Sequence, residues 1–156
     1  MAMTNTILAE VAAYLKEVMP SYSVDLHPGK LDMKTYHLSH PIGTLLVSYQ
    51  ESEYDTTSDM SMIAQRRLFK AKITIIARKL NGPDGTNDIV DKVGRALLGF
   101  TAVDCEPAWL VKDQFIEESN GLWHHEIDFQ VVTLCHTGQI DELNLLTEVE
   151  VTYEYE

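Results

Sequence analysis

The segment from Arg66 to Lys79 constrains the fold most, because apolar and basic side chains alternate along it. Every second residue from position 69 is apolar: Phe69, Ala71, Ile73, Ile75 and Ala77. Successive side chains of a strand point to opposite faces, so the pattern predicts one long strand with a buried face and a basic face. Three isoleucines and one threonine in the segment favour strand over helix.

This strand also concentrates the positive charge of an acidic chain. Six of the 12 Lys and Arg residues lie in it, although the formal net charge is -12: Arg66, Arg67, Lys70, Lys72, Arg78 and Lys79. Two interpretations stay open, a solvated face balanced by acids of the same chain or a contact with another subunit. The overall negative charge argues against direct, sequence-specific binding of nucleic acid, because contacts to phosphate require positive surface.

The other periodic segments predict an α+β fold: an antiparallel or mixed sheet of about four strands, with two helices packed on one face. Helices are expected at 6–19 and 86–98, and strands at 21–26, 43–50, 66–79 and 122–135. The segment 51–63 has neither period and is interpreted as a long loop, either an arm that carries contacts or a disordered connection. A connector is expected at 101–113, and Asn120-Gly121 predicts a turn.

Finer expectations concern the second helix and the second face of the sheet. Thr86 or Asn87 is expected to cap the helix at 86–98, and Gly94 inside it predicts close approach to a neighbouring backbone. The face that carries Lys70 and Lys72 is expected to be strongly charged, and to be exposed or to meet another subunit. The acidic positions of the strand at 122–135 are expected to lie across from these two lysines.

The C-terminal segment has a pattern of its own, so we divide the chain into a domain at 1–135 and an acidic extension at 136–156. The extension ends in an alternation of Val or Tyr with Glu, which predicts a final strand. Its glutamate row would suit a basic edge in the same or another subunit. The candidate interaction residues are therefore Arg66, Arg67, Lys70, Lys72, Arg78, Glu148, Glu150, Glu154 and Glu156.

No catalytic signature stands out in the sequence. His124, Glu126 and Asp128 share one strand face and are the sharpest candidates for a metal or acid–base site, but a solvated strand face explains them as well. Cys105 and Cys135 lack metal-ligand spacing and are expected to be reduced. No apolar run reaches the roughly 20 residues that span a bilayer, so we expect no membrane partner. The sequence also has no Gly-rich phosphate loop, and we expect no cofactor.

Several segments together resemble one family, the tail-terminator (tail-completion) proteins of Mu-like, contractile-tailed bacteriophages. The resemblance covers about residues 4–135 and does not include the acidic extension. The segments that carry it are Ile7–Val11, His40–Tyr49, Leu97–Phe100, Glu117–Trp123 and His125–Phe129.

The resemblance implies a structural virion protein of the tail or neck, assembled in the host cytoplasm and not an enzyme. Such proteins form a hexameric ring that caps the tail tube and stops polymerisation of tube and sheath. The ring also offers a docking surface to the neck, so the implied partners are tube, sheath and neck or connector proteins. Two alternatives remain: a neck or head–tail connector protein of similar fold, and a metal-dependent enzyme using His124, Glu126 and Asp128.

Overall fold

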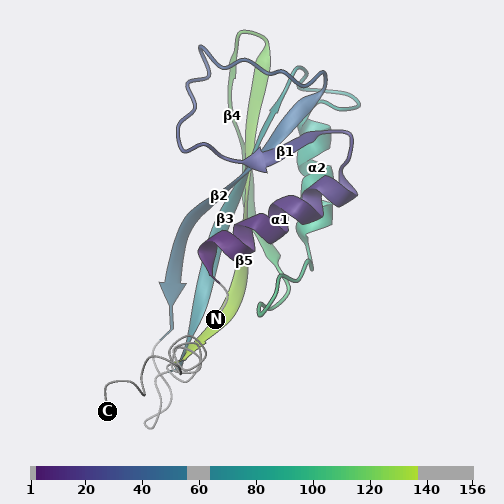
Figure 1. Ribbon diagram of the computed structural model, residues 1–156. Helices are drawn as coiled ribbons and strands as arrows, with labels where there is room; N and C mark the ends of the chain where they lie inside the picture. Colours follow the sequence, from purple (N-terminus) through teal and green to yellow (C-terminus); the bar gives the residue numbers. More distant parts are fainter. Residues whose placement is uncertain (1–2, 56–63, 137–156) are drawn as a thin grey trace, which may run out of the picture.

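The computed structural model describes residues 3–55 and 64–136, which form one open five-stranded sheet and two helices (Figure 1). The sheet is mixed and its strand order is β1-β2-β3-β5-β4. The predicted α+β fold is confirmed, with one strand more than expected. The elements are α1 (Thr4–Val18), β1 (Ser23–Leu26), β2 (Gly43–Tyr54), β3 (Ala64–Ala77), α2 (Thr86–Leu97), β4 (Trp109–Ser119) and β5 (Leu122–His136). Neither helix in these residues is long and apolar enough to cross a membrane.

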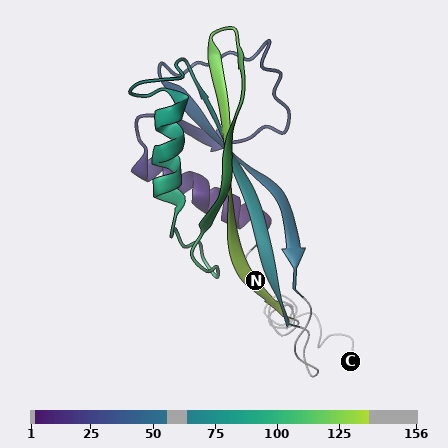
Figure 2. The same ribbon diagram turned by 180° about the vertical axis from the view of Figure 1, so that it is seen from behind.

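The main core lies between the helices and one face of the sheet. The predicted apolar row of β3, from Phe69 to Ala77, is completely buried, and Ile127 and Phe129 of β5 extend it. Both helices pack their apolar side chains on this face and belong to the same cluster. Helix α1 contributes Ile7, Val11 and Leu15, and helix α2 contributes Ile89, Val93 and Leu97. The prediction that two helices cover one face of the sheet is therefore confirmed. Figure 2 shows β2, β3 and β5 continuing beyond the helices as an extended arm.

Part of the predicted loop at 51–63 belongs to this arm instead. β2 does not stop at residue 50 but continues to Tyr54, paired with β3 throughout. The register shifts between Tyr49 and Glu51, which marks a β-bulge at Gln50. A bulge breaks the two-residue period, and this half of β2 is exposed, so its sequence lacks the alternation of a strand. Residues 56–63 lie outside the described part of the chain.

The connector expected at 101–113 also proved partly wrong, because it contains the start of β4. This strand pairs with β5 in an antiparallel hairpin, and the Asn120-Gly121 turn between them is confirmed, with φ values of 54° and 79°. Two register shifts, at Leu110/Lys112 and Phe115/Glu117, interrupt β4. Because each bulge resets which side chains share a face, the strand shows no periodic signal.

The second face of the sheet, which the sequence predicted to be strongly charged, is apolar in one part. Next to β1 it carries a small apolar cluster of Met33, Leu38, Leu46, Ile76 and Leu122. Residues 27–42, which connect β1 to the parallel strand β2, contribute Met33 and Leu38 and cover this part. Beyond this cluster the face carries Lys70, Lys72 and the polar residues of β5, with Leu68 and Val132 among them, and we call this part the open face.

Helix α2 begins at Thr86, which had been predicted to cap it, so neither Thr86 nor Asn87 is the cap. Gly85 occupies the N-cap position, and no side chain caps the helix there. Gly94 is close to side chains and not to a backbone: a Cβ atom on it would lie 3.3 Å from the Cδ1 atoms of both Ile127 and Leu110. The glycine therefore lets α2 pack closely against β5 and β4.

Candidate assembly surface

The open face carries polar side chains on all four long strands. One row of cross-strand partners consists of Ser48, Lys72, Asp128 and Lys112, on β2, β3, β5 and β4 in turn. The next row consists of Glu51, Lys70, Gln130 and Trp109. The expectation that acidic residues of β5 lie across from the β3 lysines is confirmed for Lys72, which faces Asp128, but Lys70 faces Gln130.

The lysines of β3 are already neutralised within the subunit. Lys72 Nζ lies 2.9 Å from Glu126 Oε1, and the two side chains are only 25% and 18% exposed. Lys70 Nζ lies 3.5 Å from a carboxylate oxygen of Glu51 and 3.4 Å from one of Glu53. The hydrogen bond to Glu53, with its negative charge, raises the pKa of Lys70. The open face is therefore a band of mixed charge, not a basic stripe.

Arg66 and Arg67 lie on opposite faces of β3. Arg66 is exposed at the arm and lies 3.5 Å from Asp55. Arg67 is only 7% exposed and lies on the helix side, with its guanidinium carbon 5.0 Å from the centre of the Phe69 ring. It donates hydrogen bonds to Ser52 Oγ at 2.9 Å and to Thr4 Oγ1 at 2.8 Å. Arg67 thus ties the first turn of α1 to the arm.

Arg78 is also separated from the lysines, because it follows the end of β3. Its guanidinium donates to the backbone carbonyls of Leu38 at 2.7 Å, His40 at 3.1 Å and Pro41 at 3.2 Å. It therefore holds the end of the connection between β1 and β2. Of the five basic candidates, the structure brings only Arg66, Lys70 and Lys72 to one face.

The place of β3 in the sheet changes the expected contact with the acidic C-terminal strand. β3 pairs with β2 on one side and with β5 on the other, so no strand can add beside it. A contact at these basic residues must involve side chains instead. Glu148, Glu150, Glu154 and Glu156 lie outside the described residues, and their partner stays a prediction.

The candidate metal or acid–base site consists of buried groups with different partners. His124 is 8% exposed, and neither ring nitrogen has a hydrogen-bond partner. Its Nε2 atom lies 3.6 Å from Glu126 Oε2, but Glu126 also binds Lys72. Burial lowers the pKa of His124 and raises that of Asp128. Within residues 3–55 and 64–136, no group of three His, Cys, Asp or Glu side chains is arranged to hold a metal ion.

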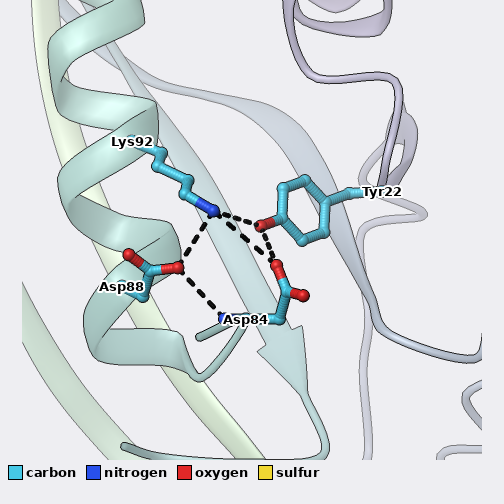
Figure 3. Close-up of polar contacts among 4 residues, drawn as sticks. All are labelled: Tyr22, Asp84, Asp88 and Lys92. Atoms are coloured by element: carbon cyan, nitrogen blue, oxygen red, sulfur yellow. Dashed lines mark hydrogen bonds and ion pairs between the residues drawn. The ribbon is translucent and has the colours of Figure 1, made fainter. Parts of the chain in front are cut away.

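A polar cluster that the sequence analysis missed joins β1 to α2 (Figure 3). The Tyr22 hydroxyl donates to Asp84 Oδ1 at 2.6 Å, and Lys92 Nζ lies 3.0 Å from Asp88 Oδ2. Lys92 also donates to the Tyr22 hydroxyl at 3.3 Å, and the Asp84 amide donates to Asp88 at 3.0 Å. The spacing of Asp88 and Lys92 is a helical i,i+4 signal, but nothing in the sequence links Tyr22 to them. These contacts fix the turn before α2 against the start of β1.

Apolar side chains are exposed along β4, the edge strand of the sheet. Trp109, Leu110, Val111 and Phe115 are 39%, 36%, 49% and 48% exposed. β4 pairs only with β5, so its outer main-chain groups have no strand beside them in the described chain. An unpaired edge with apolar side chains is a site at which another strand can bind.

Comparisons with known proteins identify the family. A solved structure described as "Virion of native gene transfer agent (GTA) particle" contains a chain similar to this one, at 15% sequence identity and a TM-score of 0.45. The alignment covers 81% of this chain and 86% of that chain. A search of curated proteins found no match. The family model described as Gp37 protein matches residues 11–155, which include most of the acidic extension. The chain therefore belongs to the Gp37 protein family.

Proposed function

We propose that this Gp37 protein is a structural protein of a phage-like virion and acts as its tail terminator. It forms a ring on the end of the tail tube, stops polymerisation of tube and sheath, and receives the neck. The resemblance of residues 4–135 to tail terminators suggests this role. The observation that carries it is the unpaired β4 edge with its four exposed apolar side chains, which suits a protein that functions in an assembly.

The faces of the subunit have separate tasks in this proposal. The sheet edges join subunits into the ring, because added strands bind through main-chain hydrogen bonds. The open face and the arm contact the tube, sheath or neck proteins, and the mixed charges of Lys70, Lys72, Glu51 and Glu53 select the partner. The acidic extension at 136–156 adds a salt-sensitive contact with a neighbouring subunit or the sheath. The protein acts in the virion after assembly in the host cytoplasm.

The test is to delete the gene from the phage or prophage that carries it and to examine particles by electron microscopy, with the intact gene supplied in trans as control. We expect tails of irregular length or tails that do not join heads, and restoration by the intact gene. Tails of normal length with a ring at the end but no head would identify a neck or connector protein instead. Normal, infectious particles would exclude both roles.

A further inference from the structure

The sheet of one subunit has two unlike free edges. β4 forms one of them. On the other side, β1 pairs with β2 only from Thr44 to Val47. β2 therefore has no strand beside its outer half, Ser48–Tyr54, within the described chain. We call this segment the β2 outer half.

Strand directions make these two edges complementary. The pairs β2–β3, β3–β5 and β5–β4 are all antiparallel, so β4 runs opposite to β2. In a second subunit related to the first by a rotation about an axis along the strands, β2 keeps its direction. That β2 is then antiparallel to β4 of the first subunit, and the helices of both lie on the same side of a continuous sheet. A contact between two unlike edges is heterologous, and such contacts close into rings when the rotation permits.

The two edges also lie at the same height in the sheet. The rows described above begin at Ser48 and Glu51 in β2 and end at Lys112 and Trp109 in β4. Residues 109–112 of β4 are therefore level with Ser48–Glu51, the first part of the β2 outer half. Two neighbouring subunits can pair these segments without moving along the strand direction.

The side chains at the two edges suit each other in polarity and charge. Leu110 of β4 and Tyr49 of β2 both lie on the helix side, and they are 36% and 40% exposed. On the open face, Lys112 is the only basic residue of β4, whereas the β2 outer half has Glu51 and Glu53 and no basic residue. Pairing of the edges would bury the apolar side chains and bring Lys112 opposite Ser48, one row from the Glu51 carboxylate.

We propose that the start of β4, residues 109–112, binds Ser48–Glu51 of the β2 outer half in a second copy of this chain. This inference rests on the ring of the proposed function and identifies the two edges that form it. Each junction continues the five-stranded sheet into the next subunit through main-chain hydrogen bonds. The partner at both edges is the same protein, so one subunit binds two neighbours.

Disulfide cross-linking of the full chain tests this interface. In a background with Cys105→Ser and Cys135→Ser, one variant carries Lys112→Cys on β4 and another carries Ser48→Cys on β2. These positions face each other in the proposed register; Lys112 is exposed and Ser48 is partly exposed. Each variant is oxidised alone, and then the two are mixed and oxidised. A third variant with Lys16→Cys, on the exposed side of α1, replaces either partner as a control for random collisions. Circular dichroism checks that each variant retains the fold.

We expect covalent dimers mainly in the mixture of Lys112→Cys and Ser48→Cys. A chain with both substitutions should give a ladder of oligomers that ends at the ring size. Dimers of Lys112→Cys alone as the main product would show β4–β4 pairing and overturn the proposal. Cross-linking no greater than with Lys16→Cys would overturn it too. Either failure leaves the terminator role intact if deletion of the gene still disturbs tail length.

Discussion

The neighbouring residues Arg66 and Arg67 give a sharp test of the fold, because sequence analysis grouped them and the structure separates them. Arg67→Ala removes two hydrogen bonds from a charged donor, to Ser52 Oγ and Thr4 Oγ1. Hydrogen bonds to charged groups contribute about 1.5–3 kcal/mol each, and release of a buried cation offsets part of the loss. We expect Arg67→Ala to lower the free energy of unfolding by about 2–4 kcal/mol.

Arg66→Ala is the matched control. The Arg66 side chain is 55% exposed, and its contact with Asp55 is a surface ion pair, so its loss should change stability by less than about 0.5 kcal/mol. Urea denaturation followed by circular dichroism measures both variants at the same protein concentration. For a chain of this size, the expected loss for Arg67→Ala corresponds to roughly 4–16 °C in melting temperature. Equal, small effects of the two substitutions would refute the structural role of Arg67.

Three further predictions concern stability. Burial lowers the pKa of His124, so below about pH 6.5 the unfolded chain takes up protons that the folded chain resists. The free energy of unfolding should therefore fall between pH 7 and pH 5, and His124→Gln should reduce this slope; an unchanged slope would contradict the assignment. Tyr22→Phe removes the hydrogen bond to Asp84 and should cost about 1 kcal/mol in urea denaturation, whereas no loss would mean that the cluster does not stabilise the turn. Gly94→Val places new methyl groups against Ile127 and should cost about 1–3 kcal/mol, while a gain in melting temperature would exclude close packing there.

The regular core was readable from the sequence because burial there follows a strict period. β3 and β5 each pack one face under the helices, and their alternation predicted both strands and their adjacency. Glycine and asparagine at 120–121 marked the hairpin turn, since both take positive φ values. Where side chains alternate regularly between a buried and an exposed face, the pattern of apolar residues is sufficient to predict the strand.

The outer part of β2 and the strand β4 were not predicted, because their sequences lack the two-residue period of a regular strand. The bulges at Gln50 and in β4 reset the alternation, and both segments lie at sheet edges where few side chains are buried. Arg67 was grouped with the lysines by charge, although its odd position places it with Phe69. Residues 27–42 cover part of the second face with Met33 and Leu38, but this connection has no periodic pattern from which the contact could be predicted. The candidate assembly surface was therefore found only in part, because its edges are the least regular strands.

The most direct test of the central claim, a ring joined through β4, is the mass of the purified full chain in solution by light scattering. The wild-type protein should give a closed species, near six 17.7 kDa chains if the ring resembles those of tail terminators. Val111→Lys places a charge on the β4 edge and should yield the single chain. Val103→Lys is the control, since Val103 is 50% exposed and Val111 49%, but Val103 lies outside the strands. A single chain in the wild type at every concentration, or an assembly that Val111→Lys leaves intact, would contradict the account.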